Sequence, residues 1–292
     1  MSAARLIGLV SLAMLAFAAN SILNRAAVGG GEIDALSFAI LRAVSGAIML
    51  SALVLARRRR VPVLRPQRVV GAGALTLYLL GFSVAYVQID AGLGALILFG
   101  AVQVTMFAGG VVGGDRPPAR RWIGAAVALV GLGWLIWPAG AISVPPMAAA
   151  AMLAAGVGWG VYSLAGRGAT DPLAETAANF AWAAPLCLLP VLLLPASPEA
   201  SPPTSYGVAL AVVSGAITSG LGYALWYAVL PRMAPSVSGL VQLSVPVIAA
   251  AAGVALLGEG LSLRMLGAGA LTLGGIAYGL GAFHMIRGSR AS

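Results

Sequence analysis

Long apolar runs recur along the whole chain, separated by short segments rich in glycine, proline or arginine. A helix that crosses the hydrocarbon core of a membrane needs roughly 20 mostly apolar residues. A transmembrane β-strand would instead alternate apolar and polar positions over about ten residues. The pattern therefore predicts an all-α polytopic membrane protein with ten transmembrane helices. They are expected over residues 6–24, 35–56, 69–89, 92–112, 122–138, 147–166, 173–194, 205–229, 236–257 and 265–286.

The composition agrees with a membrane protein and excludes several other classes. Hydrophobic residues make up 60% of the chain and charged residues only 9%, whereas about a quarter of a soluble domain is charged. Cys187 is the only cysteine and His284 the only histidine, so neither a disulfide framework nor a four-ligand zinc site can form. We expect no metal, no cofactor and no nucleic-acid partner. Since no span carries paired acids or a nucleophile beside a histidine, we also expect no enzymatic activity.

The first apolar run allows a second interpretation. Ala16-Phe17-Ala18 is typical of a signal-peptidase site that follows an apolar stretch. The only basic residue before this run is Arg5, and the internal duplication described below gives the run a counterpart in the middle of the chain. We therefore expect it to be retained as the first transmembrane helix.

The arginines predict the orientation of the chain. All 17 basic residues are arginines, and the net charge is +9. With ten spans and a cytoplasmic N-terminus, fourteen of them lie on the cytoplasmic side, Arg25 and Arg264 lie on the other side, and Arg42 lies within a span. Because positively charged loops stay in the cytoplasm, both termini are expected there, in a bacterial cytoplasmic (inner) membrane. The run Arg57–Arg60 could also bind nucleic acid or acidic lipid, although an orientation signal accounts for it.

The chain is predicted to consist of two copies of one five-helix unit. Short motifs recur in the same order at offsets of 142 to 144 residues, about half the chain. Five is an odd number, so the second unit, residues 147–292, enters the membrane from the side opposite to the first, residues 1–146. Such an inverted repeat has two near-equivalent packings, which permit alternating access. The matches pair Arg121-x-x-Gly124 with Arg264-x-x-Gly267, Gly92-x-Gly94 with Ser236-x-Ser238, and Phe17-x-x-Asn20 with Trp159-x-x-Tyr162.

This architecture and several residues resemble the EamA-type branch of the drug/metabolite transporter superfamily. Glu259 ends the ninth span, Pro246 lies thirteen residues before it, and the tenth span is rich in glycine. Arg42 also matches a residue common in that family. The first half departs from the pattern, since Val102 and Asp115 stand at the positions of Pro246 and Glu259. The resemblance implies a ten-helix transporter, and the chain looks most like bacterial exporters of amino acids, including aromatic amino acid exporters.

Polar and aromatic side chains inside the spans outline a candidate substrate cavity. Polar groups in buried membrane helices are costly, so they usually face the interior of the bundle. Here aromatic walls and a few neutral hydrogen-bonding groups suit a substrate with a hydrophobic body and a polar end. Aromatic residues in interfacial belts and glutamines that join neighbouring helices are the alternatives. The candidate residues are Asn20, Tyr78, Phe82, Tyr86, Gln103, Trp159, Tyr162, Ser163, Tyr223, Trp226, Tyr227, Gln242 and Ser244.

Three further residues are candidates for structural or gating roles. Arg42 lies about eight residues, or roughly 12 Å, inside the second span. It could attract a substrate carboxylate, but we favour a structural bond to loop carbonyls or to Asp34. Pro246 removes a backbone donor, so it could act as a hinge or only kink its helix. Glu259 lies at the end of its span.

The placement of charge limits the transport mechanism. Proton-coupled carriers usually hold a carboxylate or a histidine within the membrane. In this chain the acidic residues lie at span ends or in loops, which predicts facilitative uniport or exchange.

The sequence thus predicts an inner-membrane transporter that exports amphipathic small metabolites, with aromatic or hydrophobic amino acids as the first candidates. Its expected partners are that small-molecule substrate and the lipid bilayer, and ten spans can enclose a cavity as a monomer. The alternatives are a multidrug or quaternary-ammonium exporter and, from a different class, a structural membrane protein that transports nothing.

Overall fold

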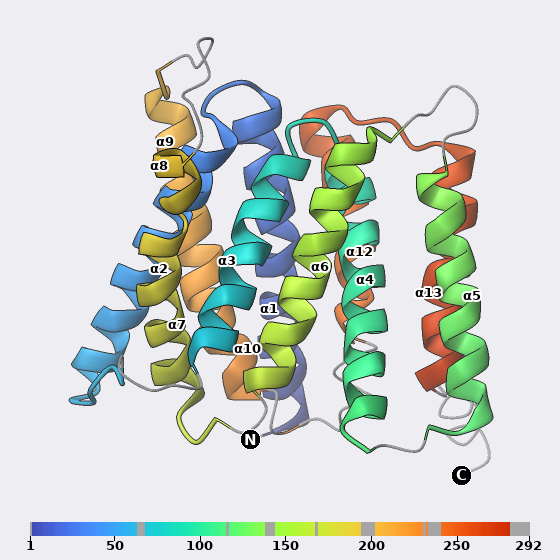
Figure 1. Ribbon diagram of the computed structural model, residues 1–292, viewed down its shortest axis with the longest axis horizontal. Helices are drawn as coiled ribbons and strands as arrows, with labels where there is room; N and C mark the ends of the chain where they lie inside the picture. The colour runs from blue at the N-terminus through green and yellow to red at the C-terminus, as the bar shows by residue number, and fades with distance from the viewer. Residues whose placement is uncertain are drawn as a thin grey trace.

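The computed structural model is a bundle of upright helices, shown in Figure 1. It describes residues 2–62, 68–114, 117–137, 144–166, 169–193, 202–229, 232 and 241–280, and within these ranges the regular structure is entirely helical. Predictions that concern Asp115, His284 and the motif Ser236-x-Ser238 lie outside the described residues. Helix α1 begins and α13 ends at the same side of the bundle, the lower side in the figure.

The helices occur where the apolar runs predict them. Within the described ranges, seven continuous helical stretches are long and apolar enough to cross a membrane, and Ser244–Leu257 is a shorter apolar helix. The helices of the first half are α1 (Ala3–Asn24), continued by the π-helical η1 (Arg25–Gly29), then α2 (Ala35–Ala56), α3 (Arg68–Ala85), α4 (Ala91–Val112) and α5 (Ala119–Ile136). Those of the second half are α6 (Pro146–Gly166), α7 (Pro172–Leu186), α8 (Leu189–Leu193), α9 (Ser205–Val213), the π-helical η2 (Ser214–Leu221), α10 (Gly222–Val229), α12 (Ser244–Leu257) and α13 (Leu263–Leu280).

Three of the expected spans are not regular α-helices throughout. The seventh is divided into α7 and α8 just after Pro185. The eighth is wound as a π-helix in its middle third, η2. In the ninth, the helix is interrupted at Leu243 and α12 starts at the next residue. Pro246 explains this interruption, because a proline ring clashes with the carbonyl four residues before it. The proline therefore lies in the first turn of α12, where its missing N–H costs little.

Side chains and glycines set several helix ends. Asp34 caps α2, since its carboxylate accepts hydrogen bonds from the backbone N–H groups of Leu36 and Ser37 at 3.0 and 2.9 Å. Thr204 caps α9 in the same way. At the other end of α12, Gly258 adopts a left-handed φ of 68°, which ends that helix.

The bundle has a central group of helices and a pair at its edge. In the central group, α2 packs on α7 and η2, α3 on α6 and α7, α4 on α6 and α12, and α1 on α12, η2 and α10. Close approach depends on glycine. A Cβ at Gly156 would lie 2.5 Å from the Cβ of Ala101, and one at Gly158 would lie 2.6 Å from the carbonyl oxygen of Ala74. Helices α5 and α13 pack on each other at one edge (Figure 1), through Gly124 and Gly275.

The outer surface of the bundle is apolar. Large hydrophobic side chains are exposed on many helices, among them Ile48, Val69, Leu192 and Leu256. Monomeric soluble proteins rarely expose so much contiguous apolar surface. Together with the apolar helices that are long enough to span a bilayer, this surface identifies a multi-pass membrane protein.

Candidate substrate cavity

Arg42 lies at the centre of a buried polar cluster. It projects from α2 and is completely inaccessible to solvent. Its Nε donates a hydrogen bond to the Ser219 Oγ on η2 at 3.0 Å. Its Nη2 donates to the hydroxyl oxygens of Tyr78 and Tyr223, at 2.8 and 3.3 Å, and the two tyrosine oxygens lie 3.3 Å apart. The side chain thus joins α2, α3, η2 and α10.

The guanidinium also lies against aromatic rings. Its Cζ is 5.1 Å from the ring centre of Tyr78 and 4.9 Å from that of Phe82, within the range of a cation–π interaction. Its third nitrogen, Nη1, is buried and has no hydrogen-bond partner. The expected bond to Asp34 does not form, because the Asp34 carboxylate caps α2, about two helical turns before Arg42.

Aromatic rings from several helices pack around this cluster. The ring of Phe17 on α1 meets Trp159, Tyr223 and Trp226 edge-on, with centroids 5.7 to 5.9 Å apart. Trp159 on α6 lies 5.0 Å from Tyr78 and 4.8 Å from Tyr223. Offset and edge-on pairs at these separations are the favoured geometries of aromatic rings. The rings therefore come from four spans that are distant in the sequence.

These rings surround a small cavity that is nearly closed in this conformation, with only ≈ 10 Å³ open to a water-sized sphere. One buried polar group at its wall, the Trp159 Nε1, has no hydrogen-bond partner. Another, the Asn20 Oδ1, accepts hydrogen bonds from Ser214 and Thr218 of η2 at 2.8 and 2.5 Å. The π-helical winding of η2 places these hydroxyls on α1. The cavity is lined by Phe17, Asn20, Ser21, Tyr78, Phe82, Leu98, Phe99, Trp159 and Tyr223.

Five of the thirteen candidate cavity residues line this cavity: Asn20, Tyr78, Phe82, Trp159 and Tyr223. Trp226 lies directly behind Phe17. Tyr86 is buried next to Phe82, but its hydroxyl is bonded to the carbonyl of Ala91. Of these residues, Tyr78 and Phe82 share one face of α3, and Tyr223 and Trp226 share one face of α10, as their helical spacing predicts.

A second aromatic pair lies beside the cavity rather than in its wall. The Tyr162 hydroxyl donates to Thr176 on α7 at 3.1 Å, and its ring meets Tyr227 on α10 at 6.5 Å. Ser163, one residue on, bonds the carbonyl of Trp159 in the preceding turn of its own helix. Tyr162 and Tyr227 therefore join α6, α7 and α10, whereas the Ser163 bond stays within α6.

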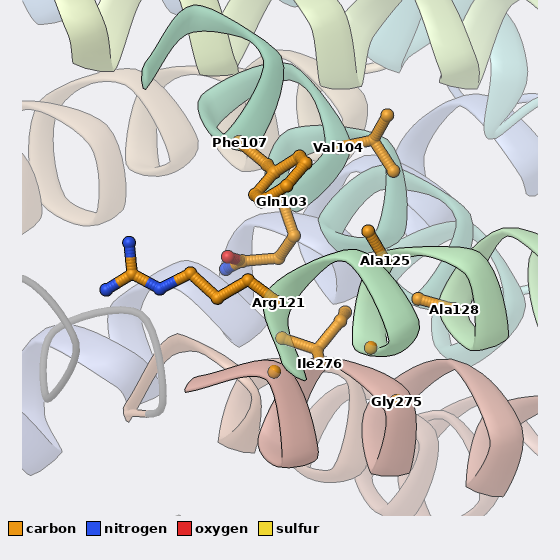
Figure 2. Close-up of a pocket in the computed structure, with 10 residues that line it drawn as sticks. Gln103, Val104, Phe107, Arg121, Ala125, Ala128, Gly275 and Ile276 are labelled. Carbon is orange, nitrogen blue, oxygen red and sulfur yellow. The ribbon is translucent and has the colours of Figure 1, made fainter. Parts of the chain in front are cut away.

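Three polar candidates lie outside the aromatic cavity. Gln242 is buried just before α12, and Ser244 bonds the carbonyl of Val241. Gln103 faces a different hollow between α4, α5 and α13, shown in Figure 2, in which ≈ 60 Å³ is open to a water-sized sphere. Its amide lies beside the stem of Arg121 there, and glycines of α13 form the opposite wall. Position in the sequence indicated a buried glutamine but not which side of α4 it faces.

An ionic cluster joins the two halves of the chain at one end of the bundle. The Arg25 guanidinium lies 3.3 Å from an Asp90 oxygen and 3.5 Å from a Glu259 oxygen. Both oxygens of Glu259 accept the backbone N–H of Ala91, at 2.8 and 2.9 Å, where α4 begins. Burial raises the pKa of the Glu259 carboxyl above its usual value, and Asp90 acts in the same direction. Sequence reasoning placed Glu259 at a span end but did not predict this contact.

Other residues of the site also escaped sequence reasoning. Leu98 and Phe99 of α4 line the cavity within a run that is apolar all round, so periodicity could not single them out. The hydroxyls of Ser214 and Thr218 are four residues apart, and this spacing was a usable signal.

Comparisons with known proteins agree with this architecture. Residues 146–279 match the EamA-like transporter family. An uncharacterized protein of Pseudomonas aeruginosa is 48% identical over 271 residues, which cover 92% of each chain. A protein of known crystal structure superimposes with a TM-score of 0.68 at 22% identity, over 93% of this chain and 98% of that one. At that identity the structural likeness shows the fold alone.

The apolar helices and the family match together define a multi-pass membrane protein of a transporter class. Residues 146–279 therefore form an EamA-like transporter domain, which supports membership of the drug/metabolite transporter superfamily.

Proposed function

We propose that the protein exports amphipathic small metabolites across the bacterial cytoplasmic membrane, with aromatic and other hydrophobic amino acids as its first candidates. The observation that carries this proposal is the aromatic cavity between α1, α3, α4, α6 and α10. Trp159, which lines this cavity, has an indole N–H without a hydrogen-bond partner. Aromatic walls favour a ring or a large apolar side chain. The polar groups favour a substrate that also has a charged or hydrogen-bonding end.

The cavity is nearly closed in this conformation. The space open to a water-sized sphere is ≈ 10 Å³, about enough for one water molecule. Alternating access therefore requires these rings to separate before a substrate the size of an amino acid can bind.

Helix packing supports an inverted repeat of residues 1–146 and 147–292. If each span is exchanged with the one five places away, the α3–α6 contact becomes the contact of α10 and η2 with α1. Likewise α4–α6 becomes α12–α1, and α2–η2 becomes α7–α3. The pairs α2–α7, α4–α12 and α5–α13 exchange into themselves. All these contacts are present, as two similar units of opposite orientation require for alternating access.

The positions of acidic side chains favour a facilitative mechanism, with a monomer as the working unit. Among the described residues, the acids lie at helix ends or in loops, and four of them pair with arginines there. A proton-coupled carrier usually holds its carboxylate among the spans. We therefore infer uniport or exchange down a gradient.

A quaternary-ammonium exporter is the alternative cargo class. The buried guanidinium of Arg42 stands behind the cavity wall without a neighbouring carboxylate in the described part of the chain. A fixed positive charge repels a cation in a low-dielectric site. The arrangement therefore disfavours this alternative. A structural membrane protein would have no use for a cavity of this kind.

Uptake of labelled amino acids into proteoliposomes tests the proposal. We expect concentration-driven uptake of phenylalanine, tyrosine or leucine that persists without a pH gradient. Trp159→Ala removes a cavity wall and should reduce that uptake strongly. Trp137→Ala is the matched control, because Trp137 is exposed at the end of α5. Equal uptake by the two variants would refute the cavity assignment, and a strict need for a pH gradient would refute the facilitative mechanism.

A further inference from the structure

We propose that Arg42 is the anion-recognition group of the cavity and that the transported molecule carries a carboxylate. This inference rests on the proposed transport function and narrows its substrate class. It predicts that a carboxylate of the substrate completes the hydrogen bonding of the guanidinium, which the protein itself leaves incomplete.

The unused donors of Arg42 are the first observation. A guanidinium has five N–H groups. Three are used by neutral hydroxyl oxygens, those of Ser219, Tyr78 and Tyr223. The two on Nη1 are buried and have no partner. Buried polar groups in proteins are almost always hydrogen-bonded, so an orphaned charged donor at the centre of a bundle requires an explanation.

The missing counter-charge is the second observation. Buried charges are normally paired, because burial of a lone ion is costly. No carboxylate lies within 4 Å of Arg42 in the described ranges, where the ion pairs involve other arginines. The carboxylates of α7 and its N-cap are paired with other arginines: Asp171 pairs with Arg59, and Glu175 pairs with Arg68. Hydroxyls and π-faces orient the guanidinium but do not neutralise it.

The third observation is the position of Arg42 relative to the cavity. Tyr78 and Tyr223 line the cavity with their rings and bond Arg42 with their hydroxyls. The guanidinium therefore lies directly behind these two tyrosines, on the side away from the cavity. Trp159 packs on both tyrosine rings and has its own unpartnered Nε1–H. This part of the site thus holds unused donors and no unused negative charge, which is the arrangement that a carboxylate needs.

A structural role for Arg42 does not explain these features. Three neutral hydrogen bonds would also join the helices if a neutral donor stood in its place, without burying a charge. Arginine is the side chain that presents paired donors to a carboxylate in a fixed plane. Because the hydroxyl partners occupy Nε and Nη2, the incoming carboxylate is expected to use Nη1 and to displace or share the tyrosine hydroxyls.

A ligand series tests the inference on the unmodified protein. Phenylalanine is compared with its methyl ester and with phenethylamine, and leucine with isoamylamine, by competition in proteoliposomes and by ligand-induced thermal stabilisation in detergent. We expect the carboxylates to bind about tenfold or more tightly than their partners, because a charge-assisted hydrogen bond is lost. The thermal measurement requires no variant, so it decides the question even if every Arg42 variant misfolds.

Two variants test whether Arg42 is the residue that distinguishes the acid from the ester. Arg42→Gln should bind acid and ester equally, whereas Arg42→Lys should keep part of the preference for the acid. A folding role alone would lower binding of every compound by the same factor, which would overturn the inference. Amines or esters that bind the unmodified protein as well as the acids would also overturn it, while transport itself stands. If no compound in the series is bound or moved, the proposed function fails and the inference falls with it.

Discussion

Glu259 provides a sharp test of how the two halves of the chain are joined. Its carboxylate belongs to the loop after α12, yet it accepts the backbone N–H of Ala91, the first residue of α4. The Glu259 side chain is 8% exposed and Ala91 is fully buried. Two substitutions separate the contribution of the hydrogen-bond acceptor from that of the charge. Glu259→Ala removes both, and Glu259→Gln keeps an acceptor oxygen but removes the charge.

The magnitudes follow from these contacts. With Glu259→Ala, the Ala91 N–H is left buried without a partner, at a cost of about 1–3 kcal/mol. Loss of an anion at the start of α4 adds about 0.3–1 kcal/mol. With Glu259→Gln, the amide oxygen still accepts the N–H, and the desolvation that raises the pKa of Glu259 is relieved. We therefore expect Glu259→Gln to lower the free energy of unfolding by less than about 1 kcal/mol.

The pH dependence has a definite sign. The folded-state pKa of Glu259 is above the usual value of 4.5, so between the two values the folded protein holds a proton that the unfolded chain has lost. The stability that this group contributes is greatest below pH 4.5 and falls as the pH rises through the folded pKa. The difference in unfolding free energy between the unmodified protein and Glu259→Gln should therefore shrink or reverse as the pH rises.

The assay is thermal or denaturant unfolding in detergent micelles, read by tryptophan fluorescence, between pH 4 and 8. The control is Glu259→Gln measured beside Glu259→Ala at each pH. If the two variants are equally destabilised at neutral pH, the charge and its pairing with Arg25 dominate, and the reasoning from burial is wrong. A stability difference that grows with rising pH would contradict it as well.

Three further predictions concern packing, charge and orientation. Gly156→Ala should prevent the protein from eluting as a single monodisperse peak on size exclusion, because the added Cβ would lie 2.5 Å from the Cβ of Ala101 and 2.7 Å from the carbonyl oxygen of Leu98. The control Gly73→Ala adds its methyl group to open space and should be tolerated. Equal elution behaviour of the two variants would refute the close α4–α6 contact. Asp171→Asn should cost less than about 1 kcal/mol, because its ion pair with Arg59 is partly exposed. Although desolvation opposes it, the Arg59 contact lowers the pKa of Asp171 below 3.8, so the contribution is present above pH 3.8 and is lost as the pH falls; unchanged acid unfolding of the variant would refute this. In a Cys187→Ser background, Gly31→Cys and Arg58→Cys should react with an impermeant maleimide from outside and inside the cell respectively, and labelling from one side only would contradict the orientation of α2.

Part of the cavity could be predicted from helical spacing. Tyr78 and Phe82 are four residues apart on a helix, as are Ser219 and Tyr223, so each pair shares one face. Residues with polar atoms in apolar helices, here Tyr78, Ser219 and Tyr223, face protein rather than lipid. All three are buried, and so is Phe82 on the face that it shares with Tyr78. The same argument failed for Gln103, because α4 is covered by protein on more than one side. A polar residue on such a helix has two interior directions available.

The sequence by itself determined the class of protein, the places of the helices and the family resemblance, because the length and polarity of an apolar run are local properties. Only the tertiary structure decided which residues meet: Arg42 with hydroxyls from both halves, Phe17 with three rings, and Glu259 with the start of α4. Those contacts depend on the rotation and the neighbours of each helix. Neither follows from periodicity, since every span here is apolar over most of its circumference.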